Sequence, residues 1–196
     1  MSIDSIFQSF PELVTERLVL RRIILADSTA LFGVLSDEEV TRFYDDATFT
    51  DLSQASEQIE AWENGYQHRR CIRWAIALKD DSTMIGSCGF YSIHPWHLRA
   101  SIGYELAHSF WRTGIMSEAL RAILAVGFNE MGLNRIDAVV LLANIASIRL
   151  LDKLGFLNEG LLRNFENWGD KGFVDLEMYS ITRSEWELAS QSIKIQ

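Results

Sequence analysis

The sequence predicts an α+β (mixed α/β) domain built on one largely antiparallel sheet. Three observations support this prediction. Short apolar segments of strand length follow one another across residues 72–107, separated by turn-forming residues. Longer segments repeat apolar residues at helical spacing. A nearly continuous apolar segment, Arg135–Leu142, follows one of these helices, which is typical of a buried strand that a helix joins to a parallel neighbour.

The first part of the chain predicts one strand and two helices. Residues Thr15–Ile23 (TERLVLRRI) alternate apolar and polar side chains as a strand does. Asp27 is expected to be the N-cap of a helix whose apolar residues come three, four and seven positions later. A second helix is expected within residues 51–70, because residues that commonly cap a helix N-terminus stand at the start of this segment. Its apolar face carries Ile59, Trp62 and Tyr66.

Three strands are then expected in an antiparallel run. They cover Ile72–Leu78, Met84–Ile93 and Leu98–Ala107. DDST (residues 80–83) and HPWH (residues 94–97) supply the two turns between them. Because short turns join antiparallel neighbours, the three strands are predicted to pair in chain order.

A long amphipathic helix is predicted after Gly114. Ser117 and Glu118 suit its first turn, and Gly132 suits its C-terminal cap. The loop before it therefore ends at a helix N-terminus, whose unpaired backbone N–H groups and positive dipole favour an anion. The apolar face of this helix consists of Leu120, Ile123, Leu124, Gly127, Phe128 and Met131.

The C-terminal part predicts a crossover, a short helix and a hairpin. The strands Leu98–Ala107 and Arg135–Leu142 flank the long helix, so we expect them to be parallel, with a right-handed crossover. A short helix is expected over Asn144–Phe156, closed by Gly155. The strands of the closing hairpin are expected at residues 160–168 and 173–181, and its turn at residues 169–172.

Composition and charge narrow the classes of function. The chain has 196 residues and a formal net charge of −9, and we expect one domain over residues 1–196 with a core at about 12–186. This acidic balance argues against a direct nucleic-acid binder, which needs a basic face. It suits a surface that steers amines toward a cleft, or one that simply keeps the protein soluble.

Cysteine usage and hydropathy indicate a cytoplasmic protein. Cys71 and Cys88 are too few for a disulfide framework and lack metal-ligand spacing. His94 and His97 have no third ligand nearby, so no metal is expected. Residues 1–16 show no signal peptide, and no stretch approaches about 18 uninterrupted apolar residues, so no membrane contact is expected.

Four segments taken together resemble the GNAT N-acetyltransferases, in particular the ribosomal-protein N-terminal acetyltransferases of the RimJ/RimL type. They are TERLVLR, IGYELAHSFWRTGIMSEAL, NRIDAVVLLANIASIRLLDKLGF and EGLLR. The resemblance extends from Thr15 to about Trp186. It implies the GNAT fold, a twisted sheet with helices on both faces that splays at its parallel strand pair. It also implies acetyl-CoA as the acetyl donor and no metal.

The resemblance also implies where acetyl-CoA binds. The family's loop places Gln or Arg, two variable residues, Gly, one residue, then Gly or Ala, and its backbone N–H groups hold the pyrophosphate. Gly114 fits this pattern, whereas Trp111 and Met116 depart from it. The plainer alternatives are a glycine needed only for its backbone angles and, for Asn144, a helix cap. We assign to the donor site Leu106, Trp111, Arg112, Thr113, Gly114, Ile115, Met116, Ser117, Asn144, Ser147, Arg149 and Lys153.

Three residues are candidates for proton transfer. Glu166 matches a glutamate proposed as the base in the RimJ/RimL branch, and Glu105, at the strand end beside the loop, is a second candidate base. A solvent-facing glutamate is the alternative for each. Ser147 matches a serine proposed to protonate the departing thiolate. Leu151 stands where many other GNAT enzymes have a tyrosine for that step.

The predicted function is a direct transfer of the acetyl group of acetyl-CoA to a primary amine. The acceptor is expected to be a protein N-terminal amine, or alternatively a small amine such as a polyamine, an amino acid or an antibiotic. A non-catalytic acyl-CoA-binding domain is the rival, because the usual tyrosine and loop sequence are absent. The chain is expected to act as a monomer or homodimer. Candidate walls of the acceptor pocket are Trp62, Tyr66, Phe165 and Trp168, although for Trp62 packing in the core is the favoured alternative.

Overall fold

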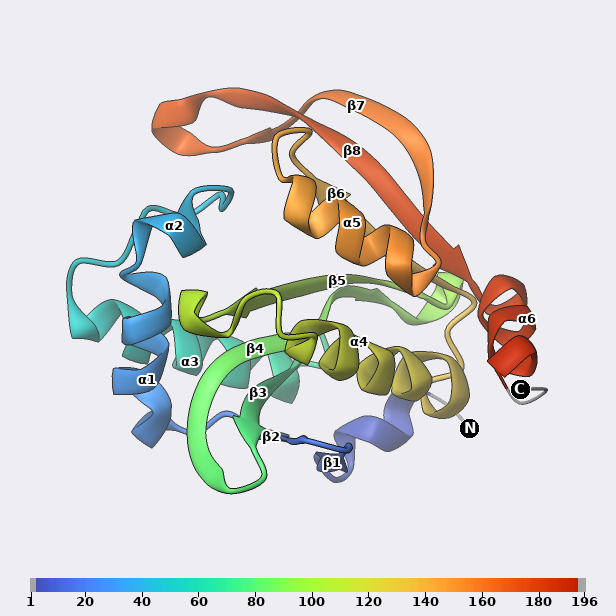
Figure 1. The fold of residues 1–196 in the computed structure, drawn as a ribbon, viewed down its shortest axis with the longest axis horizontal. Helices are drawn as coiled ribbons and strands as arrows, with labels where there is room; N and C mark the ends of the chain where they lie inside the picture. The colour runs from blue at the N-terminus through green and yellow to red at the C-terminus, as the bar shows by residue number, and fades with distance from the viewer. Residues whose placement is uncertain (1–2, 194–196) are drawn as a thin grey trace.

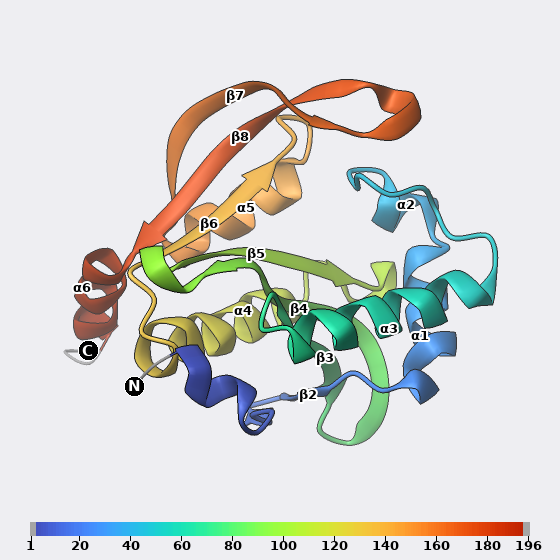
Figure 2. The same ribbon diagram turned by 180° about the vertical axis from the view of Figure 1, so that it is seen from behind.

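A computed structural model describes residues 3–193 and shows one twisted eight-stranded sheet with helices on both faces (Figures 1 and 2). The strand order is β1-β2-β3-β4-β5-β6-β8-β7. The strands are β1 (Leu13–Val14), β2 (Leu18–Arg22), β3 (Ile72–Leu78), β4 (Asp81–His94), β5 (Arg99–Leu106), β6 (Arg135–Val140), β7 (Leu157–Asn167) and β8 (Phe173–Thr182). The helices are α1 (Ser28–Leu35), α2 (Glu38–Thr41), α3 (Leu52–Gln67), α4 (Ile115–Ala125), α5 (Ile145–Leu154) and α6 (Arg183–Ile193).

Shorter helical turns connect these elements. Most are single 3₁₀ turns, and the segment that continues α4 is a π-helical turn. They are η1 (Ile3–Phe7), η2 (Leu25–Asp27), η3 (Pro95–His97), η4 (His108–Phe110), η5 (Val126–Glu130) and η6 (Gly169–Lys171).

The sheet separates at its single parallel strand pair. Every neighbouring pair in the sheet is antiparallel except β5 and β6. Beyond Ser101 and Asp137, β5 and β6 continue to Leu106 and Val140 with no further pairing, and Figure 1 shows them moving apart. The expected parallel pair and the splay are therefore confirmed. The paired positions are Arg99 with Arg135, Ala100 with Ile136 and Ser101 with Asp137.

Helices cover the two faces of the sheet with two apolar cores. α4 and α5 lie on one face and α1 and α3 on the other, as the two opposite views show (Figures 1 and 2). The larger core, beneath α4, includes the fully buried side chains of Trp74, Leu120 and Phe128. The smaller core joins α1 and α3 to the sheet through residues such as Leu31 and Ile59. The apolar face predicted for α4 is thus buried, and on α3 Ile59 and Tyr66 are buried while Trp62 is half-buried.

Helix caps follow the sequence in one case and depart from it in another. Asp51 caps α3 by accepting the N–H of Ser53 at 2.8 Å, as expected. Asp27 directly precedes α1, but its side chain does not cap the helix. It binds the guanidinium of Arg21 at 2.7 and 2.8 Å instead, because that cation lies beside it on β2. Asp27 is therefore the N-cap residue of α1, as predicted, but its side chain does not supply a capping hydrogen bond.

Several boundaries differ from the prediction because tertiary contacts extend or add elements. β4 already pairs at Asp81 with Leu78, so the first turn is shorter than residues 80–83. η1, β1, α2 and α6 were not predicted, because their periodicity is short or weak. α6 is held by Arg183, which donates to the carbonyls of Phe128 and Leu133 at 2.5 and 2.7 Å.

The long helix ends in a π turn because a glycine brings it close to the sheet. At Gly127, an added Cβ would meet Ile136 Cδ1 and Phe90 Cζ at 2.9 Å each. The wider turn that follows contains the hydrogen bond from Met131 N–H to the Val126 carbonyl, five residues back. The apolar face predicted for this helix is buried as expected.

Candidate active site

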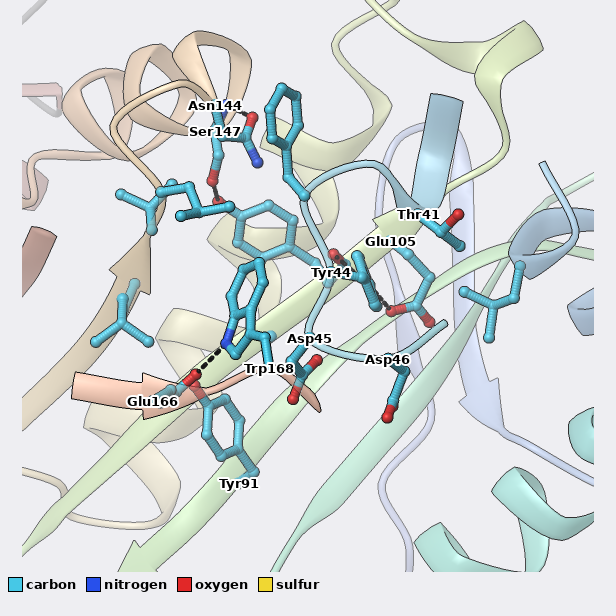
Figure 3. A pocket seen from close by; sticks show the side chains of 18 of the residues that line it. Thr41, Tyr44, Asp45, Asp46, Tyr91, Glu105, Asn144, Ser147, Glu166 and Trp168 are labelled. Atoms are coloured by element: carbon cyan, nitrogen blue, oxygen red, sulfur yellow. Dashed lines mark hydrogen bonds between the residues drawn. The ribbon is translucent and has the colours of Figure 1, made fainter. Parts of the chain in front are cut away.

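A cavity of about 360 Å³ opens where β5 and β6 part. Residues of the separated strand ends form its floor, and Asn144 and Ser147 reach it from the start of α5. Its other walls come from α3, the segment after α2 and the β7–β8 hairpin. Figure 3 shows side chains from these separate parts of the chain pointing into one space. We call this space the cleft.

The loop that enters α4 presents a row of unpaired backbone amides. Gly114 is the N-cap of α4 and has a left-handed conformation with φ +82°, and Arg112 is also left-handed with φ +61°. Within the described residues, no acceptor is hydrogen-bonded to the backbone N–H groups of residues 112–117. Successive free amides at the positive end of a helix form a concave anion site. The loop therefore fits the pyrophosphate of a coenzyme A.

An ion pair fixes this loop from outside. Glu118, in the first turn of α4, binds Arg17 Nε at 2.7 Å and accepts the hydroxyl of Thr15 at 2.6 Å. Arg17 in turn donates to the carbonyl of Thr113 at 3.0 Å. Burial favours a raised pKa for Glu118, but the hydrogen bonds from Thr15 and Arg17 outweigh it and lower that pKa. The Thr113 carbonyl is therefore hydrogen-bonded to Arg17 and not to the free amides of the loop.

The two departures from the family's loop pattern do not fill the loop. The indole of Trp111 donates to the carbonyl of Leu106 at 2.8 Å and packs on His108, with ring centroids 4.4 Å apart. Met116 has its side chain in the main core and is 8% exposed. Leu106 is buried as well, and Ile115 and Ser117 complete the first turn of α4. Both unusual side chains thus stabilise the loop, Trp111 through Leu106 and His108 and Met116 through the main core.

Glu105 is bound on several sides within the β5 wall of the cleft. Its carboxylate pairs with Arg73 and accepts the hydroxyls of Ser87 and, at 2.6 Å, Tyr44. The Glu105 side chain is only 1% exposed, so the alternative of a solvent-facing glutamate is wrong. The guanidinium of Arg73 also lies 4.6 Å from the ring centroid of Trp62. Burial first, and then the Glu105 charge, raise the pKa of Tyr44 well above its usual value.

Glu166 lies on the opposite wall and is far less engaged. It is half-buried on β7 and its carboxylate accepts the indole N–H of Trp168 at 3.0 Å. Figure 3 shows both side chains pointing into the cleft together with Tyr91. Burial, and then the charge of Glu166, raise the pKa of Tyr91 to about 12. Glu166 therefore has free carboxylate lone pairs facing a space that a substrate can enter.

Asn144 and Ser147 sit at the N-terminus of α5. The Asn144 side chain accepts the Ser147 N–H at 3.1 Å, so its capping role is confirmed. The Ser147 hydroxyl lies 2.6 Å from the hydroxyl of Tyr104, a residue of β5. Leu151 is completely buried, as expected for a helix position that faces the core.

Two of the four expected aromatic walls are confirmed. Trp62 and Trp168 line the cleft. Tyr66 does not, because its ring is buried among core aromatics and its hydroxyl donates to the Ile6 carbonyl at 3.1 Å. Phe165 is 49% exposed and is absent from the cleft lining, since it alternates with Glu166 along β7. The predicted wall positions of Tyr66 and Phe165 are therefore wrong.

One side of the cleft is acidic, and a lysine of the β7–β8 turn contacts the segment after α2. Asp45 and Asp46 follow α2 and line the cleft, and burial, followed by the neighbouring Asp45 charge, raises the pKa of Asp46. Lys171, in the β7–β8 turn, donates to the Tyr44 carbonyl at 2.8 Å and lies 5.3 Å from the Trp168 ring centroid. Carboxylates and aromatic rings together suit a cationic amine.

Some of these groups were not identified from the sequence, and others remain apart from the cleft. Tyr44, Arg73 and Tyr104 carry no local signal, because distant segments bring them together. Arg149 and Lys153 are exposed on α5 and are not among the residues that line the cleft. Their assignment to coenzyme phosphates stays a prediction.

No group of three or more side chains that could hold a metal ion occurs within residues 3–193. Cys88 lies fully buried in the core, and burial raises the pKa of its thiol. None of the helices described there is long and apolar enough to cross a membrane.

Comparisons with known proteins agree with this geometry. Residues 17–157 match the family model described as "Acetyltransferase (GNAT) domain". The chain is 41% identical over 174 residues to the uncharacterized N-acetyltransferase YoaA of Bacillus subtilis (strain 168), covering 89% of this chain and 98% of that protein. It is 38% identical over 174 residues to the uncharacterized N-acetyltransferase p20 of Bacillus licheniformis, with 89% and 97% covered. Mycobacterium smegmatis RimJ in complex with CoA-disulfide superposes with a TM-score of 0.76 at 26% identity, over 86% of this chain and 83% of RimJ.

Proposed function

This chain belongs to the GNAT acetyltransferase family, and we propose that it transfers the acetyl group of acetyl-CoA directly to a primary amine, in the first instance the N-terminal amine of a protein. One observation carries this proposal. Where β5 and β6 part, a single cleft joins the start of α5 to a half-buried carboxylate, Glu166, on the opposite wall. Donor and acceptor can therefore meet without a covalent enzyme intermediate.

The residues that would hold acetyl-CoA are those with free polar backbone groups. The amides of residues 112–117 suit the pyrophosphate, with Gly114 keeping the turn open. The β5 backbone that no longer pairs with β6 suits the pantetheine arm and supplies N–H groups for an oxyanion. When bound, acetyl-CoA supplies an activated acyl group, so the protein needs only to position the amine and manage protons.

We assign the base to Glu166 and a positioning role to Glu105. An attacking amine must be neutral, so a carboxylate in the cleft that accepts its proton speeds the reaction. Glu166 has one side-chain donor, whereas Glu105 is held by Arg73, Ser87 and Tyr44. Glu105 instead fixes Tyr44 and Arg73, which form part of the acceptor wall.

The acceptor assignment has two supports. The motifs resemble the RimJ/RimL branch, and the chain superposes on RimJ at 26% identity. The acidic and aromatic acceptor side, with Asp45, Asp46 and Trp168, suits an ammonium group that loses its proton within the cleft. A small amine shares that chemistry and is the second candidate acceptor. The two unpaired cysteines suit a reducing cytoplasm.

An acetyl-CoA turnover assay tests the proposal. Purified protein is incubated with acetyl-CoA and either peptides that carry protein N-termini or a panel of polyamines, amino acids and antibiotics, and mass spectrometry locates the acetyl group. We expect acetylation of an N-terminal α-amine. Acetylation only of small amines would move the acceptor to the second candidate.

Two other outcomes would contradict catalysis. Thermal stabilisation by acetyl-CoA, with no turnover on any amine, would identify a non-catalytic acyl-CoA-binding domain. Equal stabilisation by simple nucleotides would identify a general phosphate-ligand site at α4. Neither outcome is compatible with the proposed transfer.

A further inference from the structure

A tyrosine from the sheet reaches the first turn of α5, where the helix has no tyrosine of its own. Tyr104 lies on β5, past the last residue that pairs with β6, and its hydroxyl is 2.6 Å from that of Ser147. Leu151, one turn further along α5, is buried in the core and offers no polar atom. The neighbouring strand therefore supplies a phenol at the N-terminus of this helix.

A count of hydrogens shows that this pair has one left to donate. Tyr104 and Ser147 carry one hydroxyl hydrogen each, and the bond between them uses one. Neither hydroxyl has another hydrogen-bond partner among the described residues. Both residues line the cleft. Whichever of the two donates to the other, one O–H therefore remains for a ligand in the cleft.

Tyr104 keeps its proton at neutral pH and is the more acidic of the two groups. Burial raises the pKa of Tyr104 to about 12, although the hydrogen bond with Ser147 works in the opposite direction. A phenol still loses its proton more readily than the aliphatic alcohol of serine. A proton given up by the pair is thus finally lost by Tyr104, even when Ser147 hands it over.

We propose that Tyr104 is the proton source for the departing sulfur of the acetyl donor, with Ser147 as its hydrogen-bonded partner. This inference rests on the acetyl transfer proposed above. As the carbon–sulfur bond breaks, its electron pair stays on sulfur and the hydroxyl pair donates a proton to form S–H. Tyr104, left as a phenolate, recovers a proton from water, while Glu166 passes the proton of the attacking amine to solvent. The positive end of α5 stabilises the negative charge on sulfur meanwhile.

Tyr104→Phe tests the assignment by separating rate from binding. It removes one hydroxyl and keeps the ring, so kcat is expected to fall about 10²-fold while the acetyl-CoA dissociation constant, measured by calorimetry, stays unchanged. The matched control is Tyr66→Phe, a buried tyrosine outside the cleft whose hydroxyl donates to the Ile6 carbonyl. That control is expected to keep kcat.

Ser147→Ala separates direct donation from relay. A loss of kcat as large as that of Tyr104→Phe shows that Ser147 hands the proton over. A smaller loss shows that Tyr104 donates directly. Both results support Tyr104 as the source.

A binding measurement without turnover provides the second readout. At about pH 9.5, above the ordinary thiol pKa of about 8.5, much of the CoA sulfur is ionised and accepts strong hydrogen bonds. Tyr104→Phe is expected to bind CoA about tenfold more weakly than the unaltered protein, and to bind desulfo-CoA, which lacks the sulfur, equally well.

Two results would overturn the inference and leave the proposed function standing. One is a Tyr104→Phe variant whose kcat stays within about threefold of the unaltered protein. The other is an equal loss of affinity for CoA and desulfo-CoA, which would make Tyr104 a packing residue. Failure of the unaltered protein to bind or use acetyl-CoA would be a different result, because it overturns the proposed function and this inference with it.

Discussion

The proposed donor loop and the cleft are built in different ways. In the loop that enters α4, one continuous segment, residues 112–117, leaves its backbone amides unpaired. In the cleft, side chains from distant segments meet, among them Trp62, Glu105 and Glu166. Because a backbone site depends on dihedral angles, it tolerates unusual side chains such as Trp111 and Met116. A side-chain site has no such tolerance, since each contact depends on one particular group.

The two glutamates that line the cleft, Glu105 and Glu166, also differ in their burial and in the number of their partners. Glu105 is 1% exposed, paired with a cation and bound by two hydroxyls, whereas Glu166 is half-buried with one indole donor. The first arrangement suits a residue that stabilises the fold, and the second suits the base that we propose. The predictions below test whether stability and chemistry are divided in this way.

The largest effect is expected for Glu105→Ala, on stability. Removing this carboxylate leaves the Arg73 guanidinium, only 12% exposed, without its partner, which costs about 3–5 kcal/mol for a buried pair. Urea unfolding measures the change in the free energy of unfolding. Glu105→Gln, which retains part of the hydrogen bonding, is expected to lose less and stay folded. A loss below about 1 kcal/mol for Glu105→Ala, as for a surface pair, would show that the network does not support the fold.

The next effect concerns rate, through Glu166→Gln. Glutamine keeps the shape of the side chain but takes no proton at neutral pH, so kcat is expected to fall about 10²-fold. The defect should shrink as pH rises, because more of the amine is then already neutral. Steady-state rates between neutral and alkaline pH measure this. If the unaltered protein and Glu166→Gln share one pH profile and one rate, solvent water removes the proton.

A smaller effect is expected for Gly114→Val, in the loop that enters α4. Gly114 has φ +82°, where a β-branched residue is strained, and the substitution turns the amides away from the pyrophosphate. Affinity for acetyl-CoA should fall about tenfold, or about 1.4 kcal/mol, by calorimetry. Unchanged affinity in a folded variant would remove residues 112–117 from the donor site.

The smallest effect is expected for Arg112→Ala in the same loop. Its side chain is exposed and makes no hydrogen bond or ion pair within the described residues, so only its backbone amide is proposed to act. Affinity for acetyl-CoA should change by less than about threefold, because φ +61° strains arginine and alanine alike and the backbone amide stays in place. A loss equal to that of Gly114→Val would show that the loop binds through side chains after all.

Much of the fold was predictable because its signals are local. The helix of residues 52–67 starts at its own cap, Asp51, and the strand Ile72–Leu78 has the predicted bounds. The position of the loop with free amides was predicted for the same reason, since a glycine before an amphipathic helix determines where such amides lie. The predictions failed where a partner distant in the sequence decides, as at Tyr66, whose hydroxyl donates to the Ile6 carbonyl in the core and not to the cleft.

The sequence by itself determined the α+β class and the position of the α4 loop, because these depend on period, spacing and backbone geometry, and four of its segments carried the resemblance to the family. Only the tertiary structure decided which glutamate is buried with Arg73 and which is half-buried on the opposite wall of the cleft, since each lies on a strand whose local pattern does not tell these surroundings apart. It alone placed the Tyr104 hydroxyl against Ser147, across 43 residues of chain. A side chain's charge and hydrogen-bonding surroundings come from segments far apart in the sequence, which period and spacing do not describe.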